Sequence, residues 1–145
     1  MKVVVQRVTD ANCKVDGKIT GQINTGYMLL VGFGLSDDKQ VAEKISKLRI
    51  FEDEEGKINK SIFDVNGKIL SISQFTLYAD CKKGNRPSFT NALGGDRAVE
   101  LYKYFNECLR KLNLEVQEGI FGADMKISLL NDGPVTIVLD SEELW

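Results

Sequence analysis

Residues 27–33 read Tyr-Met-Leu-Leu-Val-Gly-Phe, a continuous apolar run that suits a strand buried on both faces. The chain before this run predicts further strand structure. Residues 3–8 read as a strand, and residues 13–23 alternate around Asp16-Gly17, a strong two-residue hairpin signal. The first 33 residues therefore predict a β-rich beginning of the fold.

The rest of the chain predicts two helices and three more strands. A helix is expected over about residues 38–49, because Ser36-Asp37-Asp38 offers capping side chains before apolar residues at helical spacing. The clearest helix is Asp96–Leu112, whose apolar side chains form one stripe. Residues 51–68 are polar, with Ile58, Ile62 and Phe63 as the expected anchors. The remaining strands are expected at Ile69–Leu77, Lys126–Leu130 and Val135–Asp140, the last two joined by a turn over residues 131–134.

This order of elements predicts an α+β fold in one domain over residues 1–145, with a largely antiparallel sheet that curls into a barrel and two main helices. Apolar residues make up 43% of the chain and charged residues 28%, ordinary values for a globular protein. No apolar run approaches the roughly 20 residues that cross a bilayer, and charge interrupts the start too soon for a signal peptide. A cytoplasmic protein without a membrane partner is expected.

The chain contains no histidine. This absence excludes Ser-His-Asp and Cys-His catalysis and removes a common zinc ligand. The three cysteines, Cys13, Cys81 and Cys108, are widely spaced and are expected to be free thiols. Any catalysis must therefore use carboxylates, a hydroxyl, a lysine, the backbone, or groups that belong to the substrate.

Three segments carry residues that packing does not readily explain. Ser73, Gln74 and Thr76 end a predicted strand with groups that bind a polar ligand or simply face water. The loop after them contains Lys82, Lys83 and Arg86, which suit phosphate contact or an ordinary solvated loop. The third segment runs from Gly119 to Met125 and continues to Gly133-Pro134, where the simplest interpretation is a turn. The residues alone identify no pair of nucleophile and base.

Taken together, these segments resemble the D-aminoacyl-tRNA deacylase family over essentially the whole chain. The most specific matches are Ser73-Gln74-Phe75-Thr76-Leu77 and Asn131-Asp132-Gly133-Pro134-Val135-Thr136, and the loop Lys83-Gly84-Asn85-Arg86-Pro87-Ser88-Phe89 also matches. Phe75 matches the chirally strict members, whereas a related branch with relaxed selectivity carries Met at this position. The resemblance implies a hydrolase that releases D-amino acids from the 3′ end of D-aminoacyl-tRNA and needs neither a metal nor another cofactor.

The resemblance further implies a homodimer in which a cis Gly133-Pro134 reaches into the partner's pocket. The two carbonyls of this pair would collide with an L side chain, whereas a D side chain would point to solvent, so selectivity comes from a clash. Arg7 resembles the family's anchor for this loop. Glycine has no side chain to collide, so charged glycyl-tRNA is expected to be rejected poorly.

Roles in the pocket follow from the same resemblance. The segment Ser73, Gln74, Phe75 and Thr76 would hold the terminal adenosine and the ester, with backbone N–H groups near Phe75 and Thr76 as an oxyanion hole. The expected substrate-binding residues are Phe121, Ala123 and Met125 on the adenosine side, with Lys82, Lys83 and Arg86 for phosphate. The substrate's own ribose 2′-hydroxyl is expected to help activate water.

Three alternatives remain open at this point. Thr76 could act as a nucleophile, although its hydroxyl would need an activating base. The protein could bind an aminoacylated tRNA end without cutting it. A metal-dependent hydrolase could use Asp80, Asp124 and Asp132, since carboxylates suit hard ions such as Mg²⁺.

Overall fold

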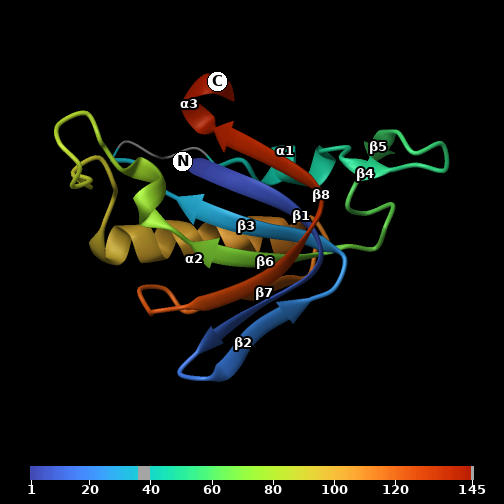
Figure 1. Cartoon of the computed structure of the whole chain (residues 1–145), viewed down its shortest axis with the longest axis horizontal. Helices are drawn as coiled ribbons and strands as arrows, with labels where there is room; N and C mark the ends of the chain where they lie inside the picture. Colours follow the sequence, from blue (N-terminus) through green and yellow to red (C-terminus); the bar gives the residue numbers. More distant parts are fainter. Residues whose placement is uncertain (36–39, 145) are drawn as a thin grey trace.

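Two long strands, β1 (Lys2–Val15) and β8 (Lys126–Asp140), pair antiparallel and link the two ends of the chain (Figure 1). The computed structural model describes residues 1–35 and 40–144. The register runs from Lys2 opposite Asp140 to Lys14 opposite Lys126. It is broken around Val8, because Gln6 faces Thr136 while Val8 faces Asn131. Residues 132–135 of β8 therefore bulge out opposite a single residue of β1, Arg7.

The other edge of β1 changes its neighbour along the strand. Its first half pairs antiparallel with β3 (Gly26–Gly32), and its second half pairs with β2 (Lys18–Ile23) through the Asp16-Gly17 hairpin. Asp16 and Gly17 both have positive φ, as a tight two-residue turn requires. Because one strand serves two partners, the sheet bends along β1.

The sheet continues from β3 through two parallel pairings, first to β6 (Lys68–Ser73) and then to β7 (Val116–Glu118). The curl brings β2 back against β7, since a Cβ placed on Gly21 would lie 2.9 Å from the carbonyl oxygen of Glu118. The sheet is thus mixed and nearly closed. This confirms the predicted α+β class and the curled sheet.

Three helices are present among the described residues: α1 (Ala42–Lys47), α2 (Gly95–Lys111) and α3 (Ser141–Leu144). The long helix α2 covers one face of the sheet (Figure 1). It buries a stripe at helical spacing that includes Tyr102, Phe105 and Leu109. Burial of a side chain such as Leu109 contributes about 1.5–3 kcal/mol, so this stripe is a main reason that α2 stays on the sheet.

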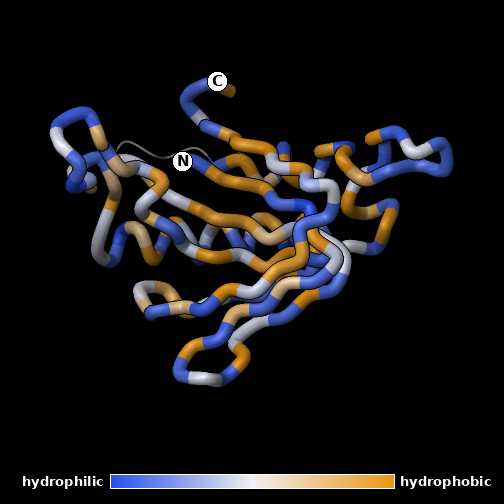
Figure 2. The backbone as a smooth tube through the Cα atoms, viewed as in Figure 1, coloured by the Kyte–Doolittle hydropathy of each residue, from blue (hydrophilic) through white to orange (hydrophobic). Residues whose placement is uncertain are grey.

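A second, smaller core fills the inside of the curl. It contains Val8, Ala11, Cys13, Ile23, Met28, Leu70 and Ile72. Residues of β3 alternate between this core and the core under α2, which explains why nearly all of β3 is buried. Figure 2 shows the same distribution, with apolar segments concentrated in the central strands and polar segments at the outer loops. No helix in the described part of the chain is long and apolar enough to span a membrane.

The structure corrects several boundaries. Residues 131–134 do not form a turn between two strands; they lie inside the continuous strand β8, because both flanking segments pair with β1. The strand predicted to reach Leu77 ends at Ser73, and a 3-10 helix, η1 (Phe75–Tyr78), follows. The start of the helix expected over residues 38–49 lies outside the described residues. Within the described part of the chain, the helix α1 spans Ala42–Lys47.

The connection between α1 and β6 also differs from expectation. It forms a small hairpin of β4 (Phe51–Glu52) and β5 (Ile58–Lys60). Of the three expected anchors, Ile62 is buried, whereas Ile58 is 56% exposed and Phe63 is 43% exposed. Asp53 caps the hairpin instead, accepting backbone hydrogen bonds from Glu55 and Lys57 at 2.9 Å. Hydrogen bonds to the Asp53 carboxylate, and not burial of Ile58 and Phe63, therefore hold this hairpin in place.

Candidate functional site

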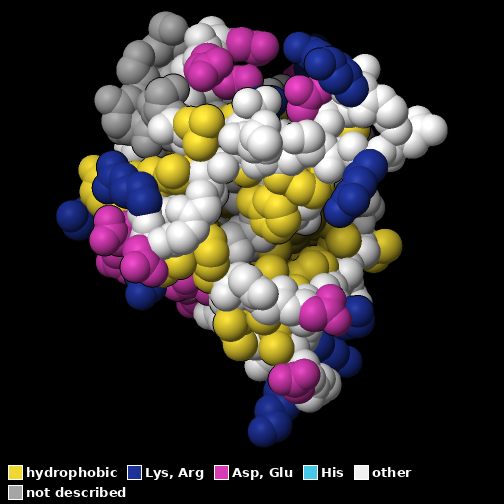
Figure 3. Space-filling model, turned by 90° about the vertical axis from the view of Figure 1, so that its left-hand side faces the viewer, with side chains coloured by type: hydrophobic (Ala, Val, Ile, Leu, Met, Phe, Trp, Pro, Cys, Tyr) yellow, Lys and Arg dark blue, Asp and Glu magenta, His cyan; other side chains and the backbone are white. Residues whose placement is uncertain are grey.

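A pocket of about 320 Å³ lies where β3 and β6 end, between η1 and the loop 119–125. Its size is at the lower end of the range of about 300–1,000 Å³ that is usual for small-ligand sites. Six of the candidate residues line it: Ser73, Gln74, Phe75, Phe121, Ala123 and Met125. The structure thus brings two segments that are distant in the sequence to one cavity. Figure 3 shows hydrophobic side chains gathered around a hollow on this face, with Lys and Arg side chains at its margins.

The first wall is built by the exit of the chain from β6. The N–H of Gln74 still donates to the carbonyl of Val31 at 2.7 Å, which continues the pairing with β3. The chain then turns into η1, whose first bond runs from the Leu77 N–H to the Gln74 carbonyl at 3.4 Å. The N–H groups of Phe75 and Thr76 precede this bond and have no acceptor within the turn. Two backbone donors are therefore left after β6; Phe75 lines the pocket, whereas Thr76 does not.

Gly32 allows this wall to come close to β3. A Cβ at Gly32 would lie 2.7 Å from the backbone oxygen of Gln74 and 3.3 Å from the Cβ of Leu77. Real Cβ atoms do not come that close to a carbonyl oxygen without a shift of the backbone. The position of the Gln74–Thr76 backbone thus depends on the missing side chain of Gly32.

The hydroxyl of Thr76 is held by its neighbour and points to no base. Its Oγ1 donates to the Oε1 of Gln74 at 2.6 Å. An amide oxygen accepts a hydrogen bond but does not remove a proton at neutral pH. Thr76 therefore lacks the activating group that a nucleophilic hydroxyl requires.

The second wall is the loop that follows β7. Gly119 is packed closely, since a Cβ there would lie 2.5 Å from the Sδ of Met125. Gly122 has φ +80°, a conformation that favours glycine, and the Ala123 N–H closes the turn on the Ile120 carbonyl at 3.1 Å. The ring of Phe121 lies 5.9 Å from that of Tyr102 on α2. The helix therefore supports the loop from behind.

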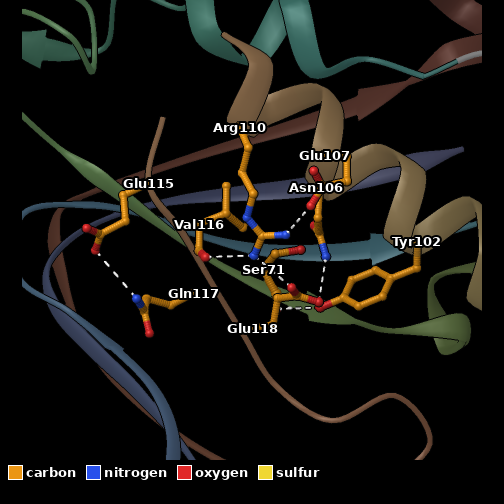
Figure 4. A network of polar contacts seen from close by, with 9 residues as sticks. All are labelled: Ser71, Tyr102, Asn106, Glu107, Arg110, Glu115, Val116, Gln117 and Glu118. Atoms are coloured by element: carbon orange, nitrogen blue, oxygen red, sulfur yellow. Dashed lines mark hydrogen bonds and ion pairs between the residues drawn. The ribbon is translucent and has the colours of Figure 1, made fainter. Parts of the chain in front are cut away.

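A polar network ties α2 to the two strands that lead into the pocket (Figure 4). The hydroxyl of Tyr102 donates to the carbonyl of Ser71 at 2.7 Å, two residues before Ser73. On β7, Glu118 accepts from Asn106 at 3.0 Å and from Arg110 at 2.7 Å. Burial raises the pKa of the Tyr102 phenol, so it stays protonated as the donor. The network fixes β6 and β7 just before each contributes a pocket wall.

The basic loop stands outside the pocket. Asp80 and Ser88 exchange backbone hydrogen bonds of 2.7 and 2.9 Å and close the loop at its base. Its side chains Lys82, Lys83 and Arg86 are exposed and do not line the cavity. Phe89, just after the closure, packs edge-to-face on Phe75 with ring centres 5.1 Å apart. The loop is thereby attached to the pocket rim.

Arg7, Gly133 and Pro134 form a second cluster, away from the pocket. The Gly133–Pro134 bond is cis, and Gly133 has φ +125°. Arg7 is only 3% exposed, donates to the carbonyls of Asp132 at 2.9 Å and Ile50 at 2.7 Å, and lies 3.8 Å from Glu52. The buried guanidinium therefore holds the bulge of β8 against the β4–β5 hairpin.

The bulge and the pocket of one chain lie at different places along the strands. Arg7 faces Tyr27 on β3, while the first pocket residue on β3, Leu30, faces Val4. Three residues of strand separate the two positions, or roughly 10 Å at the usual rise per residue. Figure 1 shows this bend of β8 at the opposite end of the sheet from the 3-10 helix after β6. Gly133 and Pro134 do not line the pocket of their own chain.

The three aspartates of the metal alternative are not brought together. Asp124 lines the pocket and pairs with Lys126 at 3.1 Å, Asp132 lies 3.5 Å from Arg7, and Asp80 caps the basic loop. Within residues 1–35 and 40–144, no group of three acidic, Cys or His residues is arranged to hold a metal ion. Each aspartate has a local structural role instead.

Sequence reasoning missed part of the apolar lining of the pocket. Leu93 and Ala98 near the start of α2 line the cavity, as do Leu30 and Val31 at the end of β3. Ala98 belongs to the apolar stripe of the helix, and no signal in the sequence separates a stripe residue that faces a cavity from one that faces the core. Ser73 and Gln74 drew attention as polar residues at a strand end, and the family resemblance assigned them to the pocket.

The sequence is similar to proteins of known activity over nearly its full length. The family model described as D-Tyr-tRNA(Tyr) deacylase matches residues 4–140. The D-aminoacyl-tRNA deacylase of Bacillus cytotoxicus is 56% identical over 146 residues, covering 98% of this chain and 100% of that protein. The corresponding enzyme of Deinococcus deserti is 57% identical over 144 residues, covering 97% and 99%.

Solved structures share the fold. One described as a c-Myc DNA unwinding element binding protein superposes with a TM-score of 0.90 at 44% identity, covering 97% of this chain and 99% of that one. A probable eukaryotic D-amino acid tRNA deacylase superposes with a TM-score of 0.75 at 18% identity, covering 95% and 97%. The second likeness concerns the fold alone.

Proposed function

The chain belongs to the D-Tyr-tRNA(Tyr) deacylase family, and we propose that it hydrolyses the ester between a D-amino acid and the terminal adenosine of tRNA in the pocket described above. The observation that carries this proposal is the pocket wall at residues 73–75, where polar side chains at the end of β6 meet a cavity of about 320 Å³. The enzyme is a hydrolase, and its substrate suits a cytoplasmic location.

The chemistry follows from what the wall offers. Water attacks the ester carbonyl, and the carbonyl oxygen becomes an oxyanion. The free N–H groups of Phe75 and Thr76 are suited to stabilise this charge, and removal of one such donor typically costs about 100- to 1,000-fold in rate. Ser73 and Gln74 orient the ribose and the ester, while Phe121, Ala123 and Met125 hold the adenosine side.

The water is activated with the help of the substrate. The chain has no histidine, and the hydroxyl of Thr76 donates to an amide oxygen. The ribose 2′-hydroxyl next to the ester is proposed to accept or relay the proton. This arrangement assigns the general base to the RNA and leaves positioning to the protein.

Thr76→Ala tests this assignment. The variant is expected to keep single-turnover deacylation of D-Tyr-tRNA within about tenfold, because it loses one side-chain hydrogen bond and no nucleophile. A D-Tyr-tRNA that carries 2′-deoxyadenosine at its end should, in contrast, resist the unaltered enzyme. An acyl ester trapped on Thr76, or a complete loss of activity in Thr76→Ala, would contradict the assignment.

Selectivity for D-amino acids is proposed to arise between two subunits. Gly133 and Pro134 do not line the pocket of their own chain, so the loop is proposed to act on the pocket of a partner chain. The Arg7 contacts that hold the bulge support a rigid loop that points its carbonyls at the substrate. An L side chain collides with these carbonyls and a D side chain does not. Glycine has no side chain that could collide with these carbonyls, so glycyl-tRNA is expected to be cleaved as well.

The deciding experiment compares D-Tyr-tRNA and L-Tyr-tRNA with the unaltered protein in the presence of a chelator. Rapid loss of the D ester alone is expected, at a rate that EDTA does not change, because the described carboxylates form no metal cluster. Saturable protection of both esters would favour a non-catalytic binder of aminoacylated tRNA ends. A rate that depends on added Mg²⁺ would restore the metal alternative.

A further inference from the structure

Two aromatic rings stand exposed at the mouth of the pocket. Phe75 is 54% exposed and Phe89 is 38% exposed, and their edge-to-face contact joins the first wall to the end of the basic loop. An aromatic pair is normally placed where it can be buried. Here the pair leaves ring surface open beside a cavity, and solvent is a poor partner for that surface.

The cavity suits the end of an RNA. Its volume of about 320 Å³ is at the lower end of the range for small-ligand sites, which suits one nucleoside with its ester. On the proposed function, the nucleotide that precedes the terminal adenosine lies outside it, at the rim. The phosphate that links the two nucleotides would come close to the loop with Lys82, Lys83 and Arg86, all of them exposed.

This combination matches the chemistry of single-strand recognition. Proteins that bind single-stranded nucleic acid use basic side chains for the backbone and exposed aromatic rings on which bases stack. The closure of the loop by Asp80 and Ser88 holds Phe89 in place before RNA arrives. The stacking surface is thus formed in advance, which lowers the entropy cost of binding.

We propose that Phe89, supported by Phe75, is a stacking platform for the base of the nucleotide that precedes the terminal adenosine. This inference rests on the proposed function and adds a second nucleotide site to it. Phe89 contributes to binding of the RNA end, not to ester cleavage. Its loss therefore raises KM and leaves kcat almost unchanged.

The test uses three D-tyrosyl esters: of adenosine, of the dinucleotide cytidylyl-adenosine, and of tRNA. Phe89→Leu keeps an apolar side chain against Phe75 but has no π face. It is expected to raise KM about tenfold for the dinucleotide and tRNA esters, and less than threefold for the adenosine ester, which has no second base. Phe89→Trp keeps a face for stacking and is expected to restore the KM of the unaltered enzyme.

Phe63 supplies the matched control, because it is exposed to a similar degree, at 43%. It lies in the connection before β6, at the Gly26 end of β3 and away from the pocket. Phe63→Leu is expected to leave all three KM values unchanged. The thermal unfolding midpoint and the oligomeric state of each variant are measured alongside.

Several outcomes would contradict the proposal that Phe89 is a stacking platform. An equal rise in KM for all three esters would place Phe89 in the adenosine pocket, and no rise for the dinucleotide would remove the second site. A change of oligomeric state in Phe89→Leu would make the rings part of a subunit contact instead. If the unaltered protein cleaves none of the esters, the proposed function itself fails, and the platform fails with it.

Discussion

Replacement of Gly32 by alanine is expected to lower kcat for D-Tyr-tRNA about 100-fold in a protein that still folds. The added Cβ would lie 2.7 Å from the backbone oxygen of Gln74, so the chain at Gln74 must move. The same backbone carries the N–H groups of Phe75 and Thr76 that are proposed to hold the oxyanion. A displacement of about 1 Å at such a site can cost about 100-fold in rate, while the overpacking costs only about 1–3 kcal/mol of stability.

Gly94→Ala is the control for this prediction. Gly94 precedes α2, and a Cβ placed there has no heavy atom within 4 Å. Single-turnover rates and thermal unfolding of both variants separate a local effect from a global one. Near-normal kcat in Gly32→Ala would mean that the 74–76 backbone is not the oxyanion site.

Pro134→Ala is expected to reduce the preference for D-Tyr-tRNA over L-Tyr-tRNA by about 10- to 100-fold, mainly through faster cleavage of the L ester. Alanine lacks the ring that fixes φ at this position, so the loop would no longer hold its carbonyls rigidly against the substrate. A lost clash of about 1.4–2.8 kcal/mol corresponds to this change in ratio. Because residues 132–135 bulge out of the ladder and are largely exposed, the effect on folding should be smaller.

Mixed dimers test whether the loop acts across subunits. A Gly32→Ala chain lacks a competent pocket but keeps its loop, and a Pro134→Ala chain keeps its pocket but lacks the loop. In a mixed dimer, the active pocket of the Pro134→Ala chain would receive the intact loop of its partner and regain rejection of the L ester. If this pocket stays permissive, or if the protein sediments as a monomer, the action in trans is wrong.

The strands and the long helix could be predicted because their patterns depend on burial alone. The run at residues 27–33 and the stripe of α2 are fixed by which faces meet the core. The bulge of β8 could not be predicted, because Gly-Pro at residues 133–134 is compatible both with a turn between two strands and with a bulge inside one strand. Only the pairing of both flanks with β1 decides between them, and that contact spans more than 120 residues.

The site residues also divide into those that the sequence predicts and those that it does not. Ser73 and Gln74 stand out in the sequence because polar groups at the end of a buried strand require a partner. Leu93 and Ala98 do not stand out, because the wall of an apolar cavity and the core use the same side chains. The position of the Phe75–Phe89 pair depends on how a loop closes on itself, and hydrophobic periodicity carries no information on that closure.

The pairing of β1 with β8 also determines when the protein can complete its fold during synthesis. A ribosome adds about 5–20 residues per second, so the edge of β1 that receives β8 waits about 6 to 25 seconds for residue 126 to be made. Throughout that interval it presents unpaired N–H and C=O groups, a template for pairing with other chains. A nascent chain released before β8 keeps this edge open permanently, so complete translation protects the protein from aggregation.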